Sequence, residues 1–178
     1  MKYIKDGKMF TMQDAPASTL EERVKRLEDI NSIKECMYHY MHYCDNLDPV
    51  GMASCFTDTG RLSWGDTLGH IDGREAILEH LKEIMGAAKT QTHYASNEQI
   101  LFGTPDSAIV YCCMYSWQTF KAQDVPDCYS YGRYETKVVR DKDGEWRFES
   151  FKLIYAGAIG ADRWGEQFNR PWPPKPIE

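Results

Sequence analysis

The chain has 178 residues, of which 42% are hydrophobic and 27% are charged, so it can form one domain with a hydrophobic core of its own. Acidic residues number 27 against 21 basic ones, which gives a formal net charge of -6. Nucleic acids and anionic membranes are bound by clustered lysine and arginine, so this charge argues against both as partners. The aromatic residues are 11 Tyr, 7 Phe and 5 Trp, which suit either a ligand pocket or an ordinary core.

The start of the chain, residues 1–10, is charged and lacks the apolar stretch of a secretory signal. No later run approaches the ~20 apolar residues that a membrane helix requires. We therefore expect a cytoplasmic protein whose six cysteines are reduced and mostly buried. Cys112 and Cys113 are adjacent in a strand-like run and should point to opposite faces, and no pair has C-x-x-C spacing. The sequence thus predicts neither a disulfide framework nor a metal site.

A polar leader, residues 1–17, precedes the first long element. Its Asp6-Gly7 lies between short apolar arms, which indicates either a hairpin or a strap that docks on a neighbouring subunit. A helix start is predicted at residues 18–22, where Ser-Thr is followed by Glu-Glu as in a capping box. The helix should end before Asp48-Pro49. Its apolar stripe, with steps of three and four residues, is Leu20, Val24, Leu27, Ile30, Ile33, Met37, Tyr40 and Cys44.

Shorter elements follow in the middle of the chain. A second amphipathic helix is predicted over residues 74–85, ending at Gly86. Before it, the pattern predicts a short helix at 49–56 and two short strands at 61–64 and 69–72, separated by Gly65-Asp66.

From residue 90 the pattern changes to β-rich segments with short polar connections, which indicates an antiparallel meander. The segments are 90–102, 107–121, 128–140 and 145–158. The tail, residues 161–178, is rich in proline and should run extended over the surface or across a subunit contact.

Helices first and a meander afterwards indicate an α+β fold. We expect a cone-shaped α+β barrel over residues 18–160, in which long N-terminal helices pack on a strongly curved antiparallel sheet. Such a cone leaves a pocket at its open end.

The residues best suited to acid–base chemistry are His93 and Asp45. By strand alternation, His93 should share one face with Ala95 and Asn97. A neutral imidazole with a pKa near ~6.5 can take a proton at neutral pH when a carboxylate orients it. Asp45 lies where the long helix ends, a position at which the helix dipole disfavours a carboxylate. The alternatives are a hydrogen-bonded core or rim histidine and a turn-forming aspartate.

Several short motifs together resemble the SnoaL-like family of the nuclear transport factor 2-like superfamily. They are Leu20-Glu21-Glu22-Arg23-Val24, Ile30, Ile33-Lys34, Tyr40 with Asp45 five residues later, Gly73-Arg74-Glu75-Ala76-Ile77, His93 with Asn97, and Asp143-Gly144-Glu145-Trp146-Arg147-Phe148. The resemblance spans residues 20–158 and is to the branch that holds scytalone dehydratase, hexachlorocyclohexane dehydrochlorinase and bile acid 7α-dehydratase.

This resemblance implies that Asp45 and His93 remove a proton while hydroxide or chloride leaves, without a metal or organic cofactor, in a homotrimer or homodimer. It also implies that Tyr40 donates a hydrogen bond to the substrate oxygen. On a regular helix, Tyr40 and Asp45 point about 140° apart, so both reach one pocket only if the helix unwinds near Cys44. Tyr43 is the alternative for this role, and a core position on the apolar stripe is the alternative for Tyr40.

Further side chains are candidates for substrate binding. They are Tyr43, Asn97, Trp64, Tyr115, Trp117, Tyr131, Phe151 and Tyr155. By the resemblance, Phe151 and Tyr155 stand where relatives carry an arginine, so a cationic substrate clamp is absent. Lys152 could replace it only if the strand register slips by one residue. This argues against a carboxylated or CoA-linked substrate and leaves a small hydrophobic cyclic molecule.

The first functional hypothesis is a cofactor-independent lyase of the dehydratase type, which acts on a small cyclic hydroxylated molecule. Isomerisation or aldol cyclisation on the same pair would begin with the same proton abstraction. The alternative is a non-catalytic small-molecule binding module or the small subunit of a ring-hydroxylating dioxygenase, because this fold is also used for both.

Overall fold

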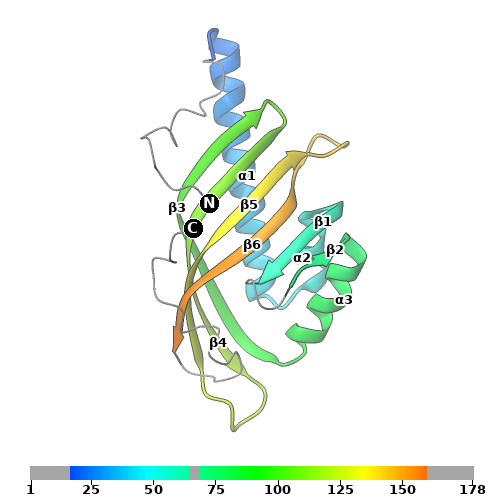
Figure 1. Ribbon diagram of the computed structural model, residues 1–178, viewed down its shortest axis with the longest axis vertical. Coiled ribbons are helices and arrows are strands. Elements are labelled where there is room, and N and C mark those ends of the chain that lie inside the picture. The colour runs from blue at the N-terminus through cyan, green and yellow to red at the C-terminus, as the bar shows by residue number, and fades with distance from the viewer. Residues whose placement is uncertain (1–16, 65–68, 160–178) are drawn as a thin grey trace, which may run out of the picture.

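The computed structural model describes residues 17–64 and 69–159. Its longest helix, α1 (Leu20–Asp45), begins with the predicted capping box (Figure 1). The Thr19 hydroxyl accepts a hydrogen bond from the Glu22 backbone N–H at 3.1 Å, and the Glu22 carboxylate accepts one from the Thr19 N–H at 3.1 Å. These contacts satisfy backbone donors that have no partner within the helix, which stabilises its first turn.

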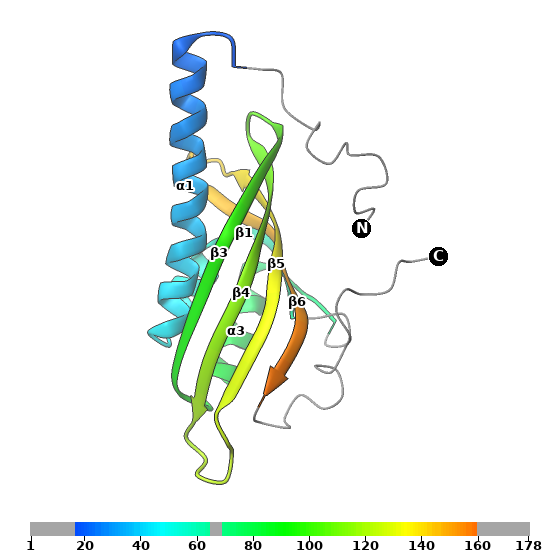
Figure 2. The ribbon, with the colours of Figure 1, turned by 90° about the vertical axis from the view of Figure 1, so that its left-hand side faces the viewer.

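The apolar stripe of α1 is buried only in its C-terminal part. Ile33, Met37 and Tyr40 are at most 2% exposed, whereas Leu20 and Leu27 are 69% and 66% exposed. The N-terminal turns of α1 extend past the end of the sheet, as Figure 2 shows, so nothing in the described chain covers them. The helical pattern of the stripe was therefore predicted correctly, but only its C-terminal part belongs to the hydrophobic core.

Two shorter helices and two strands follow α1. Helix α2 (Pro49–Ser54) is capped by Asp48, whose carboxylate accepts a hydrogen bond from the Gly51 N–H at 2.9 Å. Strands β1 (Phe56–Trp64) and β2 (Ile71–Asp72) pair with each other in antiparallel orientation. Helix α3 (Arg74–Met85) has the predicted bounds and buries Ile77, Leu81 and Met85.

The remaining chain forms the predicted meander of four long strands. They are β3 (Ala88–Thr104), β4 (Ser107–Phe120), β5 (Cys128–Arg140) and β6 (Trp146–Ile159). The six strands form one sheet in the order β2-β1-β6-β5-β4-β3. Strand β1 pairs with β6 in parallel, so the sheet is mixed, and our prediction of a wholly antiparallel sheet was wrong at this position. A parallel neighbour requires a crossover, which the intervening α3 and meander provide.

The sheet is strongly bent, and the helices pack on one face of it, as the two ribbon views show. Helix α1 contacts β3 and β6, and α3 contacts β1 and β2. Phe56, Phe148 and Phe151 are at most 1% exposed and meet the ring of Tyr40 at centroid distances of 4.5–5.9 Å. The fold is thus an α+β cone whose closed end is filled by aromatic side chains.

Three predictions fall outside the described residues: the leader hairpin at Asp6-Gly7, the Gly65-Asp66 connection and the proline-rich tail. Within residues 17–64 and 69–159, no helix combines the length and the apolar character needed to cross a membrane.

Candidate active site

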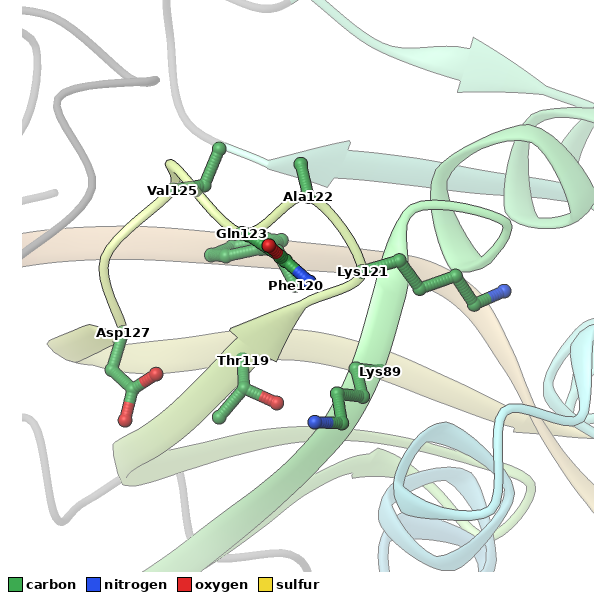
Figure 3. A pocket seen from close by; sticks show the side chains of 8 residues that line it. All are labelled: Lys89, Thr119, Phe120, Lys121, Ala122, Gln123, Val125 and Asp127. Carbon is green, nitrogen blue, oxygen red and sulfur yellow. The ribbon is translucent and has the colours of Figure 1, made fainter.

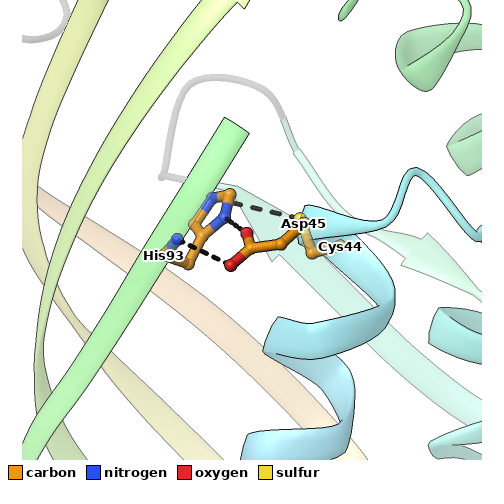
Figure 4. A group of neighbouring side chains, drawn as sticks. All are labelled: Cys44, Asp45 and His93. Carbon is orange, nitrogen blue, oxygen red and sulfur yellow. Dashed lines mark hydrogen bonds and ion pairs between the residues drawn. The ribbon is translucent and has the colours of Figure 1, made fainter. Parts of the chain in front are cut away.

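Asp45 and His93 come together where the end of α1 meets β3. Asp45 is the last residue of α1, and His93 lies on β3 opposite Ser116 of β4, a residue that faces the interior. Figure 4 shows both side chains converging from the two elements. The sequence separation of 48 residues is closed by the packing of α1 on the concave face of the sheet.

The Asp45 carboxylate holds His93 through two contacts. Its Oδ1 lies 2.8 Å from Nδ1 of the imidazole, and its Oδ2 accepts a hydrogen bond from the His93 backbone N–H at 3.1 Å. An ionised carboxylate only accepts, so Nδ1 carries the proton and Nε2 is the nitrogen left for chemistry. The His93 side chain is 9% exposed and that of Asp45 is 26% exposed, so the pair lies at the edge of solvent.

Two further residues complete the site, and the sequence interpretation did not include either. The Cys44 sulfur lies 4.0 Å from His93 Nε2. The side-chain amide of Gln91 donates to the Cys44 backbone carbonyl and, at 3.3 Å, to the Cys44 sulfur. Gln91 is two residues before His93 and therefore on the same strand face, which was the available signal. Cys44 was assigned only to the apolar stripe.

The electrostatic surroundings of His93 favour the imidazolium. Burial lowers the pKa of His93, but the neighbouring Cys44 sulfur and the hydrogen-bonded Asp45 carboxylate outweigh it and raise that pKa to about 10. These two interactions stabilise the doubly protonated ring relative to the neutral one. The pair can hold and release a proton at Nε2.

Tyr40 lies behind this pair, in the aromatic core. Burial raises the pKa of its phenol well above the usual range, and a side-chain hydrogen bond with Trp64 opposes this only in part. Helix α1 stays regular as far as Asp45. The unwinding near Cys44 that would let the Tyr40 and Asp45 side chains face one pocket therefore does not occur. Tyr40 instead shares its helix face with Cys44, one turn later. This brings the phenol near the Cys44 sulfur, which lies beside His93 Nε2.

Tyr43, the predicted alternative to Tyr40, packs against α2. Its ring is so close to Gly51 that a Cβ there would lie 2.2 Å from a ring carbon. The Tyr43 side chain thus supports the α1–α2 corner.

Asn97 does not share the face of His93, contrary to the alternation that we expected. The pairing of β3 with β4 shifts between Ser96 and Gln99, and Asn97 has a φ of 58° within this irregularity. Its amide lies 3.9 Å from the sulfur of the exposed Cys113. A β-bulge breaks the period of two, so the alternation rule fails at this point.

Three of the predicted pocket residues lie on the outer face of the sheet. Tyr115 pairs with Tyr131 and stacks on it at 5.2 Å, and Tyr94, which is 58% exposed, stacks on the other side of Tyr115. Trp117 lies in the same alternation and donates to the exposed Asp127 at 3.2 Å. The predicted pocket wall therefore does not include Tyr115, Trp117 or Tyr131. Alternation alone could not decide which face was inward.

Phe151 and Tyr155 of β6 face the interior together with Trp64 of β1. Trp64 is opposite the buried Leu153, and Phe151 is opposite Leu62. Burial raises the pKa of Tyr155, which keeps its phenol protonated. Lys152 lies between the inward Phe151 and Leu153 and so belongs to the other face. The pairing of β6 with β5 is regular from Ser150 to Tyr155, so no slip within this segment turns the lysine inward.

A separate open depression lies at the β4–β5 connection, away from this pair (Figure 3). Lys89, the residue of β3 that borders it, is four positions before His93, or about 13 Å along the strand. The Lys121 ammonium donates to the Gly86 carbonyl at 2.9 Å. The residues that line the depression are Lys89, Thr119, Phe120, Lys121, Ala122, Gln123, Val125 and Asp127. Neither Asp45 nor His93 lines this depression.

Cys44, Asp45 and His93 offer ligand atoms within 4.8 Å of one another. However, Asp45 lies on Nδ1 of the ring and Cys44 on Nε2, and one ion cannot bind at both nitrogens. Three protein ligands are also the number in catalytic zinc sites. An ion on Nδ1 would have to replace the hydrogen bond with Asp45 that holds the ring.

Comparison with known proteins places this geometry in a family. The family model of the SnoaL-like domain matches residues 25–152. A putative scytalone dehydratase from Novosphingobium aromaticivorans superposes with a TM-score of 0.71 at 24% identity, covering 77% of this chain and 90% of that one. A type 2 hexachlorocyclohexane dehydrochlorinase, LinA, gives 0.70 at 15% identity, covering 87% and 99%.

A putative aromatic ring hydroxylase from the same Novosphingobium species gives a TM-score of 0.69 at 21% identity, covering 76% of this chain and 95% of that one. No functionally curated protein sequence matches the chain. At these identities the structural similarity establishes the fold, and the family match extends over most of the cone. The chain belongs to the family of SnoaL-like domains.

Proposed function

We propose that this protein is a lyase of the dehydratase type, which removes water from a small cyclic hydroxylated molecule. The observation that carries the proposal is the 2.8 Å contact between Asp45 Oδ1 and His93 Nδ1, because it directs Nε2 toward a reacting group. The family match and the dehydratase and dehydrochlorinase names among the structural neighbours support the same class of reaction.

In this reaction, Nε2 of neutral His93 takes the proton from a carbon next to a carbonyl. The electron pair of that C–H bond forms the double bond, and the C–O bond to the neighbouring hydroxyl breaks. The imidazolium returns the proton to the departing hydroxide, which leaves as water. Asp45 stabilises the imidazolium between the two steps.

Substrate binding would prepare the ring for this role. A reacting C–H group must approach Nε2 within about 3–3.5 Å, where the Cys44 sulfur now lies at 4.0 Å. Separating the sulfur from the ring removes one of the interactions that raise the pKa of His93. The ring then loses its proton more readily, and the neutral base forms next to the substrate.

Tyr40 would bind the oxygen on which negative charge develops. Its buried phenol stays protonated at neutral pH, because burial raises its pKa, so it can donate a hydrogen bond. Trp64 contacts the phenol and restricts its position. Phe151 and Tyr155 supply apolar contact for a ring-shaped substrate.

The test is turnover of a cyclic β-hydroxy ketone, followed by the ultraviolet absorbance of the conjugated enone product. The His93→Gln variant should lose about 10²- to 10⁴-fold in kcat/KM, the usual worth of a positioned base. His39→Gln is the matched control, because it makes the same change at an exposed position of α1 and should leave turnover intact. Full turnover in His93→Gln would contradict the mechanism.

Hydrogen exchange separates this reaction from other uses of the same pair. In D₂O, exchange of the carbon-bound proton without loss of water would indicate an isomerase or cyclase. Ligand-dependent stabilisation of both wild type and His93→Gln, without exchange in either, would indicate a binding module.

A further inference from the structure

Cys44 is placed as a nucleophile would be beside a histidine base. Its sulfur lies 4.0 Å from Nε2 of His93, and Nδ1 of the same ring lies 2.8 Å from the Asp45 carboxylate. Figure 4 shows the sulfur and the carboxylate both reaching the imidazole from the end of α1. This is the order thiol, imidazole, carboxylate, in which each group orients or activates the next.

A hydrogen-bond donor also points at the sulfur. The Gln91 amide donates to Cys44 Sγ at 3.3 Å and to the Cys44 backbone carbonyl, so its direction is set by two contacts. An N–H directed at sulfur stabilises a thiolate more than a thiol. The site therefore supplies an imidazolium and an amide to a developing negative charge on Cys44.

Two features act against the thiolate, and both are weaker. Cys44 lies in the last turn of α1, where the helix dipole is negative. Asp45 is also negative, but its carboxylate is paired with the His93 ring, with Oδ1 2.8 Å from Nδ1. The helix end acts on the sulfur only through partial charges, whereas a protonated imidazole carries a full charge 4.0 Å from it.

The other described cysteines provide an internal comparison. Cys112 is also buried, and burial raises its pKa to about 12, which makes it an inert thiol. Cys113 is exposed, and the side chain near its sulfur is the neutral amide of Asn97. Accessibility alone would make Cys113 the most reactive of these three, whereas activation by the imidazole favours Cys44.

We propose that Cys44 is a covalent-addition site for small α,β-unsaturated carbonyl compounds, activated by His93 and Asp45. The choice of electrophile rests on the proposed function, because eliminating water from a β-hydroxy ketone forms such an enone close to the sulfur. Thiol reactivity at Cys44 does not itself depend on that function. Cys44 is 9% exposed, so an electrophile must be small to reach its sulfur.

In the addition, the Cys44 thiolate forms a carbon–sulfur bond at the β-carbon, and the π electrons of the double bond move to the α-carbon. His93 Nε2 donates its proton to that carbon. The elements of S–H are thus added across the double bond, with no oxidant or reductant. The product is a thioether that blocks Nε2, so accumulated enone would inhibit the acid–base pair.

The experiment uses the full chain and 2-cyclohexen-1-one as probe, with saturated cyclohexanone as the unreactive control. Intact mass should increase by one cyclohexenone, and peptide mapping should place it on Cys44 at least tenfold faster than on Cys113. Cys113→Ser should leave the single adduct, Cys44→Ser should remove it, and His93→Gln should slow it at least tenfold. Faster labelling of Cys113, or an equal Cys44 rate in His93→Gln, would overturn the proposal.

Adduct formation without turnover of β-hydroxy ketones would refute the dehydratase and leave this site standing.

Discussion

Asp45 contacts His93 twice, through Oδ1 to the ring nitrogen Nδ1 at 2.8 Å and through Oδ2 to the backbone N–H at 3.1 Å. The second contact ties the carboxylate to β3 itself, so the imidazole is held relative to the strand as well as to the end of α1. The helix dipole destabilises a carboxylate at a helix C-terminus. For Asp45, the positive charge of the protonated His93 ring offsets this effect.

The first prediction concerns the charge of Asp45. Asp45→Asn removes one of the groups that raise the pKa of His93 to about 10, so that pKa should fall. In the wild type the neutral base forms as pH rises toward 10, and kcat/KM should rise with pH over this range. In Asp45→Asn the rise should occur at lower pH, with a maximum reduced by up to about 10⁴-fold because the amide no longer holds the proton on Nδ1. NMR titration of the imidazole measures the pKa directly, and an unchanged value would contradict this account.

The second prediction concerns the phenol of Tyr40. Tyr40→Phe keeps the ring that packs on Phe148 and Phe151 but removes the hydrogen-bond donor. Turnover should fall about 5- to 150-fold, the worth of roughly 1–3 kcal/mol of transition-state hydrogen bonding, while the thermal midpoint changes little. Tyr131→Phe is the matched control on the outer face and should not alter turnover. Equal effects of the two substitutions would remove Tyr40 from the site.

The third prediction concerns the close approach of β5 and β6 at Gly132. A Cβ at this position would lie 2.3 Å from the Ile154 carbonyl oxygen, beside the register shift between Tyr131 and Gly132. Gly132→Ala should lower the free energy of unfolding by about 1–3 kcal/mol, because the strands must separate. At Gly103 the nearest atom would be 3.6 Å from the added Cβ, so Gly103→Ala is the control. Denaturant unfolding of both variants checks the difference, and equal stabilities would show that β5 adjusts freely.

The fourth prediction compares two carboxylates that bind Arg140. Asp29 has an 11% exposed side chain and also accepts from the Trp146 indole at 3.4 Å, whereas Asp106 is 67% exposed and accepts from Arg140 at 3.0 Å. Asp29→Ala should cost about 1–3 kcal/mol, because the buried Trp146 indole loses its acceptor while Arg140 keeps Asp106, and Asp106→Ala should cost at most about 1 kcal/mol. Chemical denaturation of the two variants measures both values, and similar costs would contradict the dependence on burial.

The same pair gives a pH dependence. Burial raises the pKa of Asp29, but hydrogen bonds from Arg140 and Lys25 outweigh it, and the net pKa is lowered. A lowered folded-state pKa contributes stability above the unfolded value of 3.8, and this contribution is lost as pH falls through the lower folded value. The stability difference between wild type and Asp29→Ala should therefore shrink below about pH 4.

The sequence alone determined most elements of the fold, because helix and strand periods are local properties of the chain. The capping residues at Thr19 and Glu22 and the period of α3 predicted those helices closely, and the meander followed from alternating segments between short polar connections. The parallel pairing of β1 with β6 was missed, because pairing between distant segments leaves no local pattern.

Tertiary structure decided the composition of the site. His93 and Asp45 were chosen from the sequence, and the packing of α1 on β3 brought them into contact. The bulge near Asn97 and the outward face of Tyr115 could not be predicted, since alternation relates neighbours to each other but does not orient the strand relative to the core. Cys44 became part of the site for the same reason: its distance to Nε2 is set by how two elements pack, and no spacing along the chain encodes it.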